Sequence, residues 1–223
     1  MIRPDAAKMK QDHERLDPGR NYGSVSESAY DQFVVRLLSP SVANLVLDAG
    51  TGNGRFAEYI SNLGCTVVGV DINFSILSTA KRRLQRSNVD LIVGDLSSLP
   101  FRNFVFDRIL CVHNLWYVRA YEKAVSSMIN SLKVDGLMVI DHLNLFAFFG
   151  LTYFRRSFSL ILRRGICDIG RRRKTILRPF LGRGTFEVSY LSAMKPLIIG
   201  RRPVAFAKRF TVAFRRRQTP AEA

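Results

Sequence analysis

The sequence lacks the features that mark secreted and membrane-spanning proteins. No apolar run reaches the roughly 18 residues that a spanning helix needs, and residues 1–17 are charged throughout, so we expect no signal peptide. The three cysteines, Cys65, Cys111 and Cys167, are scattered, with neither a disulfide pattern nor metal-ligand spacing. These absences lead us to expect a cytoplasmic protein that binds no metal ion.

Acidic residues are scarce in the last third of the chain. Residues 145–223 carry 3 Asp and Glu against 18 Lys and Arg, whereas residues 1–144 carry 15 against 16. The formal net charge of +16 therefore belongs almost wholly to the C-terminal part. Such an asymmetry indicates an anionic partner or surface.

Three alternating glycines form the most informative motif. Residues 46–57 read VLDAGTGNGRFA, in which Asp48 ends an apolar run and the glycines precede a helical pattern. This order predicts a buried strand that turns sharply into a helix, with backbone N–H groups free to meet a ligand. The turn alone also fits a nicotinamide-dinucleotide fold, because Gly52-x-Gly54-x-x-Ala57 matches GxGxxA.

Strand and helix patterns alternate after this turn. Apolar runs predict strands at Thr66–Val70, Val89–Gly94, Phe106–Val112 and Leu137–Ile140, and helical patterns fall at Arg55–Leu63, Ser75–Gln85 and Arg119–Leu132. This alternation predicts an α/β fold with a doubly wound, mostly parallel sheet. At the end of the second strand, Asp71 stands about 20 residues past the glycines, where an acid can accept hydrogen bonds from ribose hydroxyls.

Five motifs in this order resemble the class I S-adenosylmethionine (SAM)-dependent methyltransferases. They read VLDAGTGNG, VVGVDINFSIL, GDLSSLPF, FDRILCVHNLWYV and LKVDGLMVIDH, and cover roughly residues 25–142. The match is to the small-molecule branch that includes quinone C-methyltransferases. This resemblance implies SAM as the cofactor and a seven-stranded Rossmann-like sheet. The runs Thr185–Ser192 and Val204–Phe214 then fit a final antiparallel pair, with the last strand between the fifth and sixth.

The resemblance also implies contacts for the methionine end of SAM. The turn backbone would cradle this end, Asp48 would orient the turn, and the backbone of Cys111 would lie near the sulfonium. The turn residues concerned are Gly50, Thr51, Gly52 and Gly54.

The adenosine end would meet the next two strand ends. Asp71 would hold the ribose and Ile72 would pack on the adenine. Asp95 would meet the adenine amino group, with Leu96 beside the ring. Taken singly, Asp71 also fits a helix cap and Asp95 a turn residue.

Two histidines follow predicted strands and are candidate general bases. His113 follows the fourth strand and His142 the fifth, and ligands of doubly wound sheets lie beyond such strand ends. Each histidine equally fits a packing or hydrogen-bonding role. Trp116 and Tyr117 are candidate walls of the acceptor pocket, and Asn114 could orient an acceptor.

Two flanking segments complete the prediction. Ser24-x-x-Glu27 reads as a capping box before an amphipathic helix that ends near Pro40, and in the resembled family such a helix flanks the SAM cleft. Arg20 and Tyr22 before it either touch the methionine carboxylate or are ordinary exposed residues.

Residues 145–164 (LFAFFGLTYFRRSFSLILRR) form a basic amphipathic pattern. The apolar side comprises Leu151, Phe154, Phe158, Ile161 and Leu162. Such a helix could lie on an anionic membrane surface or cover the acceptor pocket.

These observations predict one domain and three possible functions. Its parts are a core at 24–144, an insertion at 145–183, final strands at 184–217 and a tail at 218–223. The favoured function is methylation of an O, N or C atom on a small hydrophobic or lipid-like acceptor, with peripheral membrane contact. The alternatives are an RNA methyltransferase, which the basic C-terminal third could serve, and a non-catalytic interaction protein. The acceptor and the oligomeric state stay open.

Overall fold

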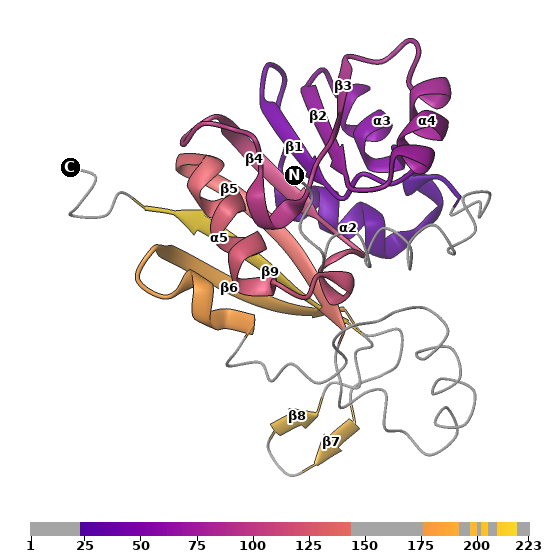
Figure 1. The fold of residues 1–223 in the computed structure, drawn as a ribbon. Coiled ribbons are helices and arrows are strands. Elements are labelled where there is room, and N and C mark those ends of the chain that lie inside the picture. Colours follow the sequence, from indigo (N-terminus) through magenta and orange to yellow (C-terminus); the bar gives the residue numbers. More distant parts are fainter. Residues whose placement is uncertain (1–22, 144–175, 192–196, 200–201, 205–208, 218–223) are drawn as a thin grey trace.

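A seven-stranded sheet forms the centre of the protein (Figure 1). The computed structural model describes residues 23–143, 176–191, 197–199, 202–204 and 209–217. The strand order is β3-β2-β1-β4-β5-β9-β6, and a separate hairpin pairs β7 with β8. The strands are β1 (Leu45–Ala49), β2 (Thr66–Asp71), β3 (Val89–Val93), β4 (Phe106–Cys111), β5 (Leu132–Leu143), β6 (Gly184–Leu191), β7 (Leu197–Ile199), β8 (Arg202–Val204) and β9 (Arg209–Arg216).

The predicted topology is confirmed. The pairs β1–β2, β2–β3, β1–β4 and β4–β5 are parallel, whereas β9 runs antiparallel to both β5 and β6. The last strand therefore inserts between the fifth and the sixth, as expected. A parallel arrangement brings the carboxyl ends of β1 to β5 to one edge, which we call the carboxyl edge.

Helices cover the sheet on two sides, which we name by their helices. The α2 face packs against α2 (Ala29–Leu38), α3 (Arg55–Ser61) and α4 (Phe74–Arg83). The α5 face packs against α5 (Tyr121–Ser131) and the 3₁₀ helix η4 (Arg178–Phe180). Successive strand residues alternate between them, because side chains along a strand point to opposite faces. On β5, Val139 joins the core of the α2 face and Ile140 that of the α5 face.

The start of α2 differs from the prediction. The capping box of Ser24 and Glu27 begins a short 3₁₀ helix, η1 (Val25–Glu27), and α2 begins only at Ala29. Ser28 is extended, with φ −108° and ψ 112°, and its side chain accepts a hydrogen bond from the Asp31 N–H. A second capping serine therefore restarts the chain as an α-helix.

The fifth strand is longer than the predicted Leu137–Ile140. It pairs with β4 from Leu132 onward, with a register shift opposite Phe106–Arg108. Asp135 there has a φ of 60°. Asp135 and Gly136, which precede the predicted strand, thus lie at an irregularity inside a strand that continues on both sides of them.

The predicted final strand, Val204–Phe214, was wrong at both ends. Val204 belongs to the β7–β8 hairpin, and β9 spans Arg209–Arg216. The strand continues to Arg216, a residue that is 4% exposed and whose guanidinium donates to the carbonyls of Ile129, Asn130 and Leu132. Arg216 belongs to the basic C-terminal third of the sequence, yet it fastens the C-terminal end of α5.

Within the described ranges, no helix is both long enough and apolar enough to cross a membrane. The basic amphipathic segment at 145–164, and Arg20 with Tyr22, lie outside the described residues.

Candidate functional site

A cleft opens at the carboxyl edge, where β1, β2, β3 and β4 end. Its walls come from the loops that follow each of these strands, so residues far apart in sequence meet there. The lining residues are Gly50, Asp71, Ile72, Gly94, Asp95, Leu96, Asn114, Tyr117 and Val118. The structure thereby brings together five of the residues proposed for cofactor contact, and adds Asn114 and Tyr117 from the predicted acceptor loop.

The glycine turn has the backbone that its sequence predicts. Gly50, Gly52 and Gly54 have φ values of 80°, 56° and 80°, in the left-handed region that side chains disfavour. A Cβ on Gly52 would meet no atom within 4 Å, so the turn leaves open space at that point. A Cβ on Gly50 would instead lie 2.3 Å from the side chain of Asn114. The turn thus offers a bare backbone beside the cleft.

Asp71 joins the end of β2 to this turn. One carboxylate oxygen accepts the N–H of Gly52 at 3.0 Å and the other accepts the N–H of Asn73 at 2.9 Å. Each carboxylate oxygen can accept about two hydrogen bonds, so the side chain, which lines the cleft, can still accept from a ligand. Asn73 caps α4, so the helix-cap role considered for Asp71 belongs to its neighbour.

Asp48 lies beneath the turn with only 3% of its surface exposed. Its carboxylate accepts the hydroxyl of Thr51 at 2.7 Å, which ties the turn to β1. Burial is the main cause that raises the pKa of Asp48 to about 6, against the lowering effect of Thr51 and Arg55. Asp48 therefore gains its charge near neutral pH.

The remaining predicted contacts differ in exposure to the cleft. Asp95 lines it and also caps a short 3₁₀ helix, η2 (Leu96–Ser98), by accepting the N–H of Ser97 at 2.8 Å. Ile72 and Leu96 add apolar surface to the walls. Cys111 is fully buried below the edge, where burial raises the pKa of its thiol well above the usual range. Its side chain takes no part in the lining.

Asn114 bridges the loop after β4 and the glycine turn. Its side-chain amide donates to the carbonyl of Gly50 at 2.6 Å and to that of Val112 at 2.9 Å. This contact explains why Gly50 has no room for a Cβ. The loop that carries His113 is therefore fixed to the start of the turn.

Known proteins share this arrangement. Residues 47–140 match the family of the methyltransferase domain. A demethylmenaquinone methyltransferase of Renibacterium salmoninarum is 34% identical over 95 residues, which cover 43% of this chain and 39% of that protein. A ubiquinone/menaquinone biosynthesis C-methyltransferase of Pseudomonas savastanoi is 33% identical over 118 residues, covering 50% of this chain and 46% of that protein. The chain matches about half the length, or less, of these curated relatives.

Solved structures share the fold over most of the chain. The N-methyltransferase NodS from Bradyrhizobium japonicum, solved with S-adenosyl-L-homocysteine, superposes with a TM-score of 0.68 at 17% identity, covering 97% of this chain and all of that one. An S-adenosylmethionine-dependent methyltransferase from Mesorhizobium loti gives 0.66 at 16% identity, covering 86% of this chain.

The match to the methyltransferase domain family, over residues 47–140, includes every residue that lines the cleft. The matched family implies SAM as the cofactor, and the cleft fits that group. The backbone at Gly52 leaves open space, the Asp71 carboxylate lines the cleft, and Ile72 and Leu96 add apolar surface to its walls. The family match spans the turn, Asp71 and Asp95 together, and therefore argues against the nicotinamide-dinucleotide fold.

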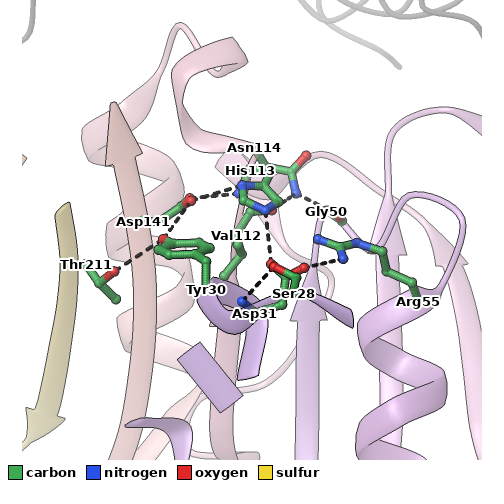
Figure 2. A network of polar contacts seen from close by, with 10 residues as sticks. All are labelled: Ser28, Tyr30, Asp31, Gly50, Arg55, Val112, His113, Asn114, Asp141 and Thr211. Carbon is green, nitrogen blue, oxygen red and sulfur yellow. Dashed lines mark hydrogen bonds and ion pairs between the residues drawn. The ribbon is translucent and has the colours of Figure 1, made fainter. Parts of the chain in front are cut away.

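Beside the cleft, His113 lies in a network of polar contacts (Figure 2). Its Nδ1 is 3.1 Å from a carboxylate oxygen of Asp141 at the end of β5, and its Nε2 is 3.4 Å from a carboxylate oxygen of Asp31 on α2. The N–H of His113 also donates to Asp141 at 2.7 Å. Arg55, the first residue of α3, pairs with the other oxygen of Asp31.

Asp31 and Tyr30 connect this network to α2. Burial would raise the pKa of Asp31, but hydrogen bonds from His113 and Arg55, together with the charge of Arg55, hold it well below its usual range. The Tyr30 hydroxyl donates to Asp141 at 3.0 Å and lies 3.2 Å from the hydroxyl of Thr211 on β9. One helix thus contacts the ends of β4, β5 and β9.

His142 lies on the opposite face of the sheet. It follows Asp141 on β5, so its side chain points toward α5, where its ring meets Tyr121 edge-on at 5.9 Å. It is only 1% exposed. The structure therefore does not bring the two candidate bases together.

Sequence reasoning missed Asp31, Arg55 and Asp141 as members of the site. Asp141 carried a usable signal, because it ends a strand just as Asp71 and Asp95 do. Asp31 lies among apolar residues of an amphipathic helix. This pattern does not identify a buried charge until the residue that pairs with it is known. In the described part of the chain, no group of three or more His, Cys, Asp or Glu residues could hold a metal ion.

Proposed function

We propose that this chain is a SAM-dependent methyltransferase that acts on a small, hydrophobic, quinone-like acceptor. One observation carries the proposal: a single cleft joins the glycine turn, Asp71 and Asp95 within the methyltransferase domain. The names of the curated relatives support a quinone-type acceptor.

The chemistry requires little covalent help from the protein. SAM supplies a methyl group already activated by its sulfonium, so the protein must align the acceptor and exclude water. Asp71 would accept hydrogen bonds from the ribose hydroxyls, and the N–H groups of Gly52 and Asn73 fix the orientation of its carboxylate. Ile72 and Leu96 would pack on the adenine, and the carboxylate of Asp95 would accept from its amino group.

The acceptor would approach from the loop after β4. Tyr117 lines the cleft and Trp116 packs behind it, with ring centroids 5.8 Å apart. Aromatic and apolar walls favour a flat hydrophobic acceptor. Whether the accepted methyl goes to carbon, oxygen or nitrogen depends on that acceptor.

We further propose that the protein works in the cytoplasm at an anionic membrane surface. The support is the excess of basic residues after position 144, together with the amphipathic pattern at 145–164. A hydrophobic acceptor dissolved in the bilayer would then be within reach.

Calorimetric titration with S-adenosyl-L-homocysteine tests the cofactor assignment. Asp71→Asn keeps the size of the side chain but removes the charge that strengthens the ribose contacts, and should weaken binding by about 1.5–3 kcal/mol. The matched control is Asp90→Asn on β3, an exposed carboxylate outside the cleft lining, which should bind like the wild type. Equal binding by all three proteins would refute the role of Asp71.

Methyl transfer from labelled SAM tests the acceptor class. The protein is incubated with separate pools of lipid extract, polar metabolites and RNA from the native host. Label in the lipid pool supports the proposal, label in RNA supports the RNA methyltransferase, and SAM binding without label in any pool supports a non-catalytic role.

A further inference from the structure

We propose that His113 is a positioning residue. Its protonated ring, held between Asp31 and Asp141, forms what we call the imidazolium clasp, which fastens α2 to the carboxyl edge where the cofactor would bind. The inference rests on the proposed function for its effect on cofactor binding. The contacts that make the clasp are themselves independent of any ligand.

The first step is the hydrogen-bonding capacity of the ring. Nδ1 faces Asp141 and Nε2 faces Asp31, so each ring nitrogen has a carboxylate oxygen within 3.4 Å (Figure 2). A neutral imidazole carries one N–H and one lone pair, whereas the protonated ring donates from both nitrogens. A neutral ring would therefore point a lone pair at one of two carboxylates. With both carboxyls ionised, only the imidazolium satisfies both.

The second step is the order of charges. Along the chain of contacts, cationic Arg55 meets anionic Asp31, and a protonated His113 would then meet anionic Asp141. Asp31 and Asp141 have side chains only 4% and 0% exposed. Buried carboxylates need a compensating charge. With a neutral His113 these four groups would carry a net negative charge, which the proton on the ring neutralises.

The third step is the aromatic surroundings of the ring. The ring centroids of Tyr30, Trp116 and Phe56 lie 5.7, 5.9 and 6.4 Å from that of His113. Aromatic faces attract a cation at about this distance. They cover part of the ring, and the His113 side chain is 26% exposed.

The fourth step connects the clasp to the glycine turn. Arg55 directly follows Gly54, and Asn114, which directly follows His113, donates to the carbonyl of Gly50 at 2.6 Å. Both ends of the turn are thus fixed by immediate neighbours of the clasp. His113 itself has a φ of 65°, a conformation that a non-glycine residue keeps only when its contacts hold it. Closing the clasp therefore sets the turn in its binding shape.

This arrangement makes His113 a poor general base. A base must offer a lone pair to the acceptor, and here both ring nitrogens are directed to carboxylates. The charged and titratable groups that the described residues turn toward this ring are Asp31 and Tyr30 from α2 and Asp141 from β5, with Arg55 behind Asp31. Because the clasp needs the proton, it holds at low pH and opens as the pH rises and the proton leaves.

Nitrogen-15 NMR of the ligand-free protein tests the charge directly. At about pH 7, where a free histidine is mostly neutral, both nitrogens of His113 should carry protons. Hydrogen exchange tests the fastening: α2 amides should lose protection as the pH rises from about 6.5 to about 8.5. The α5 amides, on the other face, should show no loss beyond the intrinsic rate change.

His113→Asn is the informative variant, because asparagine tolerates the left-handed backbone but cannot carry the charge. It should bind S-adenosyl-L-homocysteine about tenfold more weakly at about pH 6.5, and its affinity should not change with pH. The wild-type affinity should fall toward that of the variant at about pH 8.5. Lys133→Gln is the control, since it breaks an ion pair with Asp107 at the other end of β4 and should follow the wild type.

The outcomes separate this inference from the proposed function. If no protein binds the ligand at any pH, the proposed function fails, and the NMR and hydrogen-exchange results still decide the clasp. A ring that is neutral at about pH 7, or α2 protection that ignores both pH and the substitution, overturns the clasp. An acidic limb in the pH profile of methyl transfer that disappears in His113→Asn would reinstate His113 as a base.

Discussion

The two faces of the sheet differ in what they bury at the carboxyl edge. On the α2 face, the end of β5 contributes Asp141 to a network of charged and hydroxyl groups. On the α5 face, the next residue, His142, meets an aromatic ring, and the core around it is built from large apolar side chains such as Met128, Phe180 and Phe214. These two adjacent residues of one strand thus lie in different environments, one polar and the other apolar.

The two faces therefore contribute differently to the stability of the fold and to the positioning of the site. Apolar burial is non-directional and scales with area, so the α5 face mainly stabilises the fold. Hydrogen bonds and ion pairs are directional, and buried ion pairs add little net stability. The network of charged and hydroxyl groups on the α2 face therefore mainly fixes geometry beside the glycine turn, while the apolar core of that face adds to stability. Substitutions on the two faces should consequently affect different measurements.

Phe180→Ala should give the largest effect on stability. Phe180 is fully buried on the α5 face, with its ring 5.1 Å from that of Phe214. Removing it should lower the free energy of unfolding by about 3–5 kcal/mol in urea denaturation. The affinity of the folded protein for S-adenosyl-L-homocysteine should stay the same. A large loss of affinity with little loss of stability would break the division between the faces.

Arg216→Met should cost less, about 2–4 kcal/mol, because three backbone carbonyls at the end of α5 lose a charged donor. The neighbouring Arg215→Met is the matched control. Arg215 is exposed, and its guanidinium donates to a single carbonyl, that of Asp135, so its loss should stay within about 0.5 kcal/mol. Equal losses in the free energy of unfolding for the two variants in urea denaturation would show that the buried contacts of Arg216 do not stabilise the end of α5.

Asp48→Asn should change the pH dependence of stability by about 2 kcal/mol. Because the pKa of Asp48 is about 6 in the folded protein, against an ordinary aspartate value of 3.8, the folded state binds the extra proton between these values. The wild type should therefore lose stability as the pH rises from about 4 to about 6, and the variant should lack this loss. Unfolding curves across that range provide the measurement, and parallel curves would contradict the prediction. Asp31, whose pKa is lowered, acts in the opposite sense and contributes equally to both proteins.

The smallest effects per residue are expected in the basic part of the chain. Each Lys or Arg near an anionic leaflet contributes about 1 kcal/mol, and the apolar side at 145–164 should add burial. Anionic vesicles should sediment the protein, and Phe154→Ser with Phe158→Ser should release it even at low salt. If vesicles never bind it, the membrane proposal is wrong. If binding follows charge alone and RNA competes, the RNA methyltransferase gains support.

Much of the fold could be predicted because apolar strands and helical spacing are local signals. The glycine turn, Asp71 and Asp95 could be placed at one edge because parallel strands end together. The network around His113 could not, since its partners lie 28 and 82 positions away in sequence. Arg216 is a related case: a run of arginines gives no signal of which one is buried until the carbonyls that it satisfies are known.

The position of β9 has a consequence for the order of folding during synthesis. Residues 209–216 lie between β5 and β6, and among the described strands β6 pairs with β9 alone. The ribosome therefore releases the strand that completes the sheet last, at about 5–20 residues per second. Until then the edge of β5 that will pair with β9 is unpaired. The hydroxyl of Tyr30, which is synthesised 181 residues earlier, cannot yet contact that of Thr211. A chain that stopped before Arg209 would keep the glycine turn and Asp71, but it would expose an unpaired strand beside the cleft and invite self-association.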